Sequence, residues 1–127
     1  AGRYCDVQYI RLSEIMLTRA EALAYTTNSI DAEALQLLND IRCKPFPDGQ
    51  KPAELTAEDF PSVEAFVDSI LVERNRELAM EGHYRWDLIR TGRDLKVKGL
   101  PNNKKILPIP EYEVQISDGV IQQNTGF

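Results

Sequence analysis

The chain has 127 residues, of which 43% are hydrophobic and 28% are charged, and this composition is typical of one globular domain rather than of a disordered polypeptide. Its formal net charge of −5 argues against nucleic acid as a partner, because phosphate contacts need clustered Lys and Arg. No apolar run approaches the roughly 18 residues that span a bilayer, and two cysteines are too few for a disulfide scaffold.

The first predicted element is a helical hairpin over residues 9–43. Over residues 9–25 the helical period of three to four is kept by Leu12, Ile15, Met16, Arg19, Ala20 and Leu23. The turn-forming run TTNS follows, and either Ser29 or Asp31 can cap a second helix. One face of that helix carries Ala34, Leu35, Leu38 and Ile41. The short break predicts an antiparallel pair of the size of a tetratricopeptide unit, which needs neighbours to bury its remaining faces.

A loop is predicted over residues 44–61, where the density of proline excludes regular structure apart from one turn at residues 56–60. Helices are predicted over residues 62–92. Ser62 caps the first of them, which is expected to end at Gly82, and its apolar stripe consists of Val63, Phe66, Val67, Ile70, Leu71 and Leu78. The second is expected over residues 84–91, before Gly92.

The tail, residues 93–127, is rich in proline and is expected to form only short extended or single-turn pieces, with residues 97–105 as a loop. The predicted fold class is therefore all-α, with tetratricopeptide-like antiparallel helical pairs, long loops and an irregular C-terminal tail. Residues 1–127 are expected to form a single domain or a fragment of a larger one.

Charged and apolar side chains are crowded together in the segment ILVERNRELAMEGHYRWDLIRTGR, residues 70–93. Arg74 falls in the apolar stripe of its helix, so its guanidinium group is expected to be partly buried and to need acidic partners. Glu14 and Glu21 lie two turns apart on one side of the first helix, and we expect them, or one of them with Glu77, to meet Arg74. The predicted structural ion-pair network comprises Glu14, Glu21, Arg74, Glu77, Arg85, Asp87 and Arg90.

A catalytic or metal-binding interpretation of the same segment is weaker. Glu73, Glu77 and Glu81 share a helix face and precede His83, but one His with three Glu matches no recognised ligand motif. Neighbouring arginines compete for these carboxylates, and no nucleophile or Gly-rich phosphate loop accompanies them. We therefore predict no catalytic residue, no metal site and no cofactor, and we assign Trp86 to packing rather than to ligand stacking.

Five segments of the chain resemble, in the same order, the C-terminal part of the SusD/RagB family: YIRLSEIMLTRAEALA, ALQLLNDIR, ILVERNRELAMEGHYRWDLIRTG, LPIPEYE and QQNTGF. The resemblance implies a helical fold with tetratricopeptide-like pairs. It also implies a non-catalytic, surface-exposed outer-membrane lipoprotein that binds oligosaccharides or other nutrients and delivers them to a SusC-like TonB-dependent transporter.

Family members are several times longer than this chain, so the resemblance implies a C-terminal fragment, with membrane association through an N-terminal lipid anchor that this chain does not contain. No ligand-binding residue can be carried over onto a matched position, because the family's ligand contacts come mostly from regions upstream and from variable loops.

Two other functions stay open on the residues alone. The hairpin over residues 9–43 is compatible with a free-standing helical-repeat adaptor that binds a peptide in a groove. A glycan-cleaving enzyme using Glu77 or Glu81 is less favoured, because no pair of carboxylates stands apart from arginine neighbours. The hairpin also brings Cys5 and Cys43 to the same end of the motif, where either a disulfide bridge or two free thiols would be compatible with its geometry.

Overall fold

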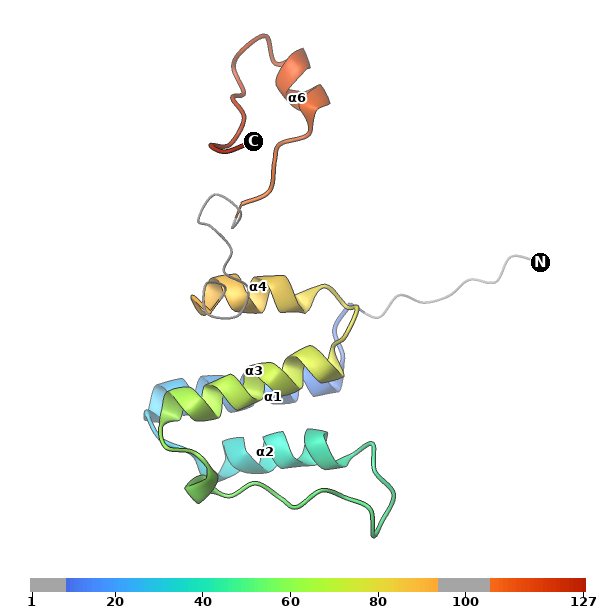
Figure 1. Ribbon diagram of the computed structural model, residues 1–127, viewed down its shortest axis with the longest axis vertical. Coiled ribbons are helices and arrows are strands. Elements are labelled where there is room, and N and C mark those ends of the chain that lie inside the picture. Colours follow the sequence, from blue (N-terminus) through green and yellow to red (C-terminus); the bar gives the residue numbers. More distant parts are fainter. Residues whose placement is uncertain (1–8, 94–105) are drawn as a thin grey trace, which may run out of the picture. The chain divides into compact units, whose positions relative to one another are not determined.

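The computed structural model describes residues 9–93 and 106–127, and every regular element within those residues is a helix (Figure 1). In chain order the elements are α1 (Leu12–Thr27), α2 (Ala32–Cys43), the 3-10 helix η1 (Ala57–Asp59), α3 (Val63–Glu77), α4 (His83–Arg90) and α6 (Glu111–Ile116). The predicted all-α class is confirmed. The chain divides into two compact units, residues 1–84 and 85–127. Among the described residues, no helix has both the length and the apolar character needed to cross a bilayer.

The first unit is built on the predicted antiparallel hairpin of α1 and α2, and α3 packs against both helices (Figure 1). Asn28 ends α1 in the left-handed conformation, with φ 48°. Asp31, rather than Ser29, caps α2, because its carboxylate accepts hydrogen bonds from the backbone N–H groups of Glu33 and Ala34 at 2.9 and 3.2 Å. The three helices enclose one core, formed by Leu17, Ala20, Ala24, Ala34, Leu38, Ile41, Phe66, Val67, Ile70 and Leu71.

The buried face of α1 differs from the apolar stripe expected from the sequence. Leu12 and Ile15, which belong to that stripe, are 73% and 52% exposed, whereas Leu17 and Ala24 are fully buried. The reason is that α1 carries apolar residues on more than one side, so spacing alone does not select the side that meets α2 and α3. Ala20 and Ala24 allow close helix approach on the buried side beside Leu17, whereas Leu12 and Ile15 are left on the outside.

Helix α3 ends at Glu77, five residues before the expected end at Gly82. Its start is as predicted, since the hydroxyl of Ser62 accepts a hydrogen bond from the N–H of Ala65 at 3.2 Å. The chain then makes a turn in which Met80 and Gly82 have φ angles of 68° and 83°. These two left-handed residues break the helix and redirect the chain before α4.

The proline-rich loop after α2 is fixed to that helix by side chains. The buried amide of Asn39 donates to the carbonyl of Leu55 and accepts from its N–H, both at 2.9 Å. Arg42 donates to the carbonyl of Ala53 at 2.7 Å. The expected single turn is η1, where Asp59 accepts hydrogen bonds from the N–H and hydroxyl of Thr56, and the backbone hydrogen bond is the main reason that the pKa of Asp59 is lowered.

In the second unit the tail is organised by two polar side chains. Gln123 donates to the carbonyl and accepts from the N–H of Ile109, both at 2.8 Å, and Asn124 donates to the carbonyl of Leu107 at 2.7 Å. The tail therefore folds back on itself around the six-residue helix α6, which is longer than the single-turn pieces expected. The loop expected at residues 97–105 lies outside the described residues.

Cys43 is buried and has a free thiol, and Cys5 lies outside the described residues. We expect thiol titration of the unfolded, unreduced chain to count two reactive thiols, because the thiol of Cys43 is free in the folded structure. Reduction before unfolding supplies the control count. A count of zero without reduction would establish the bridge.

Candidate functional site

The charged cluster of the first unit centres on Arg11, which the sequence analysis did not single out. Its guanidinium Nη1 lies 2.6 Å from Glu77 Oε1, and its Nη2 lies 2.8 Å from Glu81 Oε1. The same group donates to the hydroxyl of Ser13 at 2.8 Å and to the backbone carbonyl of Glu77. Arg11 therefore fixes the start of α1 to the end of α3 and to the turn that follows α3.

Pairing with Arg11 makes Glu81 a poor candidate for a general acid. The hydrogen bond from Arg11 lowers the pKa of Glu81 and, with the bond to Glu77, raises the pKa of Arg11. A glycosidase needs one carboxyl group whose pKa is raised so that it stays protonated near neutral pH. The geometry thus favours structural ion pairs with Arg11, rather than acid catalysis, as the role of Glu77 and Glu81.

We expect the substitution Arg11→Gln to raise the pKa of Glu81 toward that of an ordinary glutamate, because the guanidinium hydrogen bond stabilises the ionised carboxylate. The pKa of Glu81 is lower in the folded than in the unfolded chain, so the stability gained from the pair is present above the unfolded pKa and is lost as pH falls through the folded pKa. NMR titration of the Glu81 carboxyl carbon in both proteins measures the shift. The substitution Arg19→Gln is the control, since Arg19 pairs instead with Glu33. An unchanged pKa in Arg11→Gln would contradict the pairing.

Arg74 is buried, as predicted, with 5% of its surface exposed. It donates hydrogen bonds to the hydroxyl of Thr18 at 2.9 Å and to the backbone carbonyl of Glu14 at 3.4 Å. The carboxylate of Glu14 lies 3.7 Å from Nδ1 of His83, and the buried Glu21 lies two turns further along α1. Glu14 and Arg74 are therefore brought together, through the Glu14 carbonyl, and the pairing of Glu21 with Arg74 stays a prediction.

The remaining members of the predicted network, Arg85, Asp87 and Arg90, belong to the second unit. Asp87 is buried, and its Oδ1 accepts from Nε and Nη2 of Arg90 at 2.9 and 2.7 Å. Arg85 is half-buried in the same helix. Trp86, however, was assigned to packing and is 56% exposed. That assignment is corrected: Asp87 and Leu88 take the buried side of α4, which turns the neighbouring indole outward.

The part of the chain that the structure describes contains no group of three His, Cys, Asp or Glu side chains placed as metal ligands. Glu73, which was weighed as a possible ligand, instead lies 3.3 Å from Nη1 of Arg76. Glu73 and Glu77 are thus each paired with an arginine.

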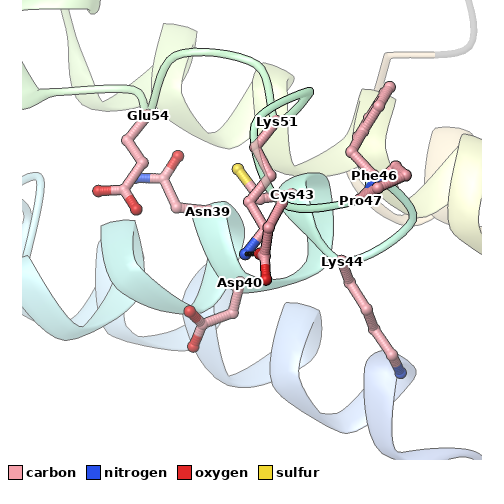
Figure 2. A pocket seen from close by; sticks show the side chains of 9 residues that line it. Asn39, Asp40, Cys43, Lys44, Phe46, Pro47, Lys51 and Glu54 are labelled. Carbon is pink, nitrogen blue, oxygen red and sulfur yellow. Dashed lines mark ion pairs between the residues drawn. The ribbon is translucent and has the colours of Figure 1, made fainter.

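A second candidate site is an open hollow of about 540 Å³ between α2 and the loop that follows it (Figure 2). Its lining consists of Asn39, Asp40, Cys43, Lys44, Phe46, Pro47, Asp48, Lys51 and Glu54. Figure 2 shows Asp40 and Glu54 at one end, Phe46 and Lys44 at the other, and Lys51 between them. The sequence analysis treated this segment only as a surface loop, because the hollow depends on how the loop is fixed to α2.

A further hollow, of about 500 Å³, shares Phe46 with the first one. Its other lining residues are Arg42, Pro45, Pro52, Glu73, Arg76 and Glu77. Phe46 therefore lines both hollows and is 45% exposed.

Comparison with known proteins gives three findings. The sequence model of the SusD family matches residues 1–106. A SusD-like protein, P38, from Formosa agariphila is 36% identical over 130 residues, which cover 96% of this chain and 25% of that protein. The crystal structure of a SusD homolog from Bacteroides thetaiotaomicron has a TM-score of 0.65 at 23% identity, covering 93% of this chain and 26% of its own, and supports the fold. The chain thus spans about a quarter of the length of these relatives.

Proposed function

The chain belongs to the SusD family, and on that basis we propose that it is the C-terminal part of a non-catalytic, cell-surface protein that binds an oligosaccharide or another nutrient and delivers it to a SusC-like TonB-dependent transporter. The observation that carries the proposal is the match of the family's sequence model to residues 1–106. The proposed location is the outer surface of the outer membrane, with attachment through a lipid anchor in a part of the protein upstream of this chain.

The charged cluster supports a binding protein rather than an enzyme. Its carboxylates at Glu77 and Glu81 are held by Arg11, and Arg74 is directed at Thr18 and the backbone of α1. These contacts hold α1 and α3 together, so the role that they support for the cluster is structural. A ligand-binding scaffold needs such contacts, and they do not require a reacting group.

The exposed side of α1 supports the proposal that this chain is part of a longer helical protein. Leu12 and Ile15 lie on a helix that already buries another face against α2 and α3. A helix that is apolar on several sides is normally covered on several sides. We propose that helices from the preceding part of the longer protein cover this face, as neighbouring units do in a tetratricopeptide-like array.

A tagged version of the longer protein tests the proposed function. After mild detergent extraction of outer membranes, we expect a TonB-dependent transporter, identified by mass spectrometry, to co-purify in stoichiometric amount. We also expect the purified protein to bind an oligosaccharide without releasing a shorter product. Recovery from the cytoplasm with a bound peptide would favour the adaptor alternative. Turnover that is abolished by Glu81→Gln would establish the enzyme.

The substitution Ile15→Glu tests whether α1 is covered in the longer protein. In the 127-residue chain we expect a change in the free energy of unfolding within about 0.5 kcal/mol, because the side chain is half-exposed there. In the longer protein the same substitution would bury a charge, and we expect a loss of about 2 kcal/mol or more. Glu33→Gln is the control, since that residue is exposed and polar. Equal effects of Ile15→Glu in both proteins would contradict a covered face.

A further inference from the structure

The hollow between α2 and its following loop has one firmly held wall. The amide of Asn39 makes two hydrogen bonds to the backbone of Leu55, at 2.9 Å each, and Arg42 holds the carbonyl of Ala53 at 2.7 Å. The thiol of Cys43 contacts the carbonyl of Pro52 at 3.9 Å. Residues 52–55 are thereby fixed along α2, and a site on this wall would be formed before a ligand arrives.

The polar lining is almost balanced in charge. The lining residues include three with carboxylates, Asp40, Asp48 and Glu54, and two with ammonium groups, Lys44 and Lys51. Asp48 and Lys51 form an ion pair at 2.9 Å. A strongly charged ligand would meet little net attraction here, whereas a ligand bearing several hydroxyl groups could donate hydrogen bonds to the carboxylates and accept them from the ammonium groups.

Phe46 supplies an apolar surface at the end of the hollow opposite Asp40 and Glu54 (Figure 2). Phe46 is 45% exposed. A half-exposed aromatic face beside polar groups suits a ligand that is apolar on one side and hydroxylated at its edge. Figure 2 shows Lys51 between Phe46 and the carboxylates of Asp40 and Glu54, so a ligand that meets both ends has to extend past Lys51.

We propose that this hollow is a subsite for a neutral oligosaccharide. One sugar ring stacks on Phe46, while hydroxyl groups of the adjoining sugar donate hydrogen bonds to the carboxylates of Asp40 and Glu54. The inference rests on the proposed nutrient-binding function and adds to it the position of a contact and the charge of the ligand. The volume of about 540 Å³ lies within the range of small-molecule sites.

Amide chemical-shift mapping of the 127-residue chain tests the subsite. The neutral probes are maltotriose, cellotriose and xylotriose, and trigalacturonic acid is the charged comparison. We expect at least one neutral probe to bind with Kd in the millimolar range and to shift resonances of residues 39–54. The variant Phe46→Ala should weaken that binding by about tenfold or more, which corresponds to loss of one stacking contact. Spectra of the free variant report whether it keeps the fold.

Trp86→Ala is the matched control, because Trp86 is also a half-exposed aromatic residue but lies in the other unit. We expect it to leave the Kd unchanged. Loss of binding in Trp86→Ala but not in Phe46→Ala would overturn the subsite and leave sugar binding intact, and so would tighter binding of trigalacturonic acid than of any neutral probe.

The longer protein separates failure of the subsite from failure of the proposed function. If it binds a neutral probe with a Kd that Phe46→Ala does not change, the subsite is wrong and the proposed function stands. If neither the chain nor the longer protein binds any of these sugars, both the subsite and oligosaccharide binding as the function are overturned.

Discussion

Replacing Arg74 with alanine is expected to lower the free energy of unfolding of the chain by about 3 kcal/mol. The side chain is 5% exposed and donates hydrogen bonds from α3 to the hydroxyl of Thr18 and the carbonyl of Glu14 in α1. Its removal takes away the hydrogen-bond donor to these two groups of α1 and opens a space in the apolar stripe of α3. Urea unfolding followed by helical circular dichroism measures the loss.

Arg76→Ala is the matched control for this experiment. Arg76 lies in the same helix, its side chain is 66% exposed, and it contacts Glu73 at 3.3 Å. An exposed pair of this kind contributes little, so we expect a change below about 0.5 kcal/mol. Equal losses in the two variants would show that burial of Arg74 does not govern its contribution. If Arg74→Ala weakened oligosaccharide binding in the longer protein without changing its free energy of unfolding, Arg74 would be a binding residue rather than a structural link between α3 and α1.

The sequence predicts those features that depend on neighbouring residues. The antiparallel hairpin follows from helical spacing on both sides of a four-residue turn, and the start of α3 follows from Ser62. Burial of Arg74 follows from its place three residues after Leu71 in the apolar stripe. Each of these inferences needs only the local period and a capping residue.

Features that depend on distant residues were not predictable in the same way. Arg11 meets Glu77 across 66 positions of the chain, and no spacing rule connects them. Helix α3 stops early because Met80 adopts the left-handed conformation, which is rare for a residue with a side chain and has no sequence signal. The hollow near Phe46 exists because Asn39 holds Leu55, and an asparagine within a helix gives no sign of which loop it will bind.

The largest loss of stability in the chain is expected from Phe66→Ala, at about 4 kcal/mol. Phe66 is fully buried in the core shared by α1, α2 and α3. Its ring also meets that of Phe60 edge to face, with centroids 5.1 Å apart and planes inclined by 67°. Truncation would therefore open a cavity in the core and remove the contact that joins the end of the loop to α3.

Two further substitutions separate the cavity from the aromatic contact and keep the experiment informative if Phe66→Ala does not fold. Phe66→Leu retains much of the apolar volume, so we expect it to be less destabilising than Phe66→Ala, in proportion to the smaller cavity. Phe60→Leu removes the edge-to-face contact from the partly buried side, and we expect a loss of about 1 kcal/mol. If Phe60→Leu cost as much as Phe66→Ala, the loop rather than the helical core would carry the stability of this unit. The hollow beside Phe46 would then depend on the Phe60 contact as much as on Asn39, because both join the same loop to the helices.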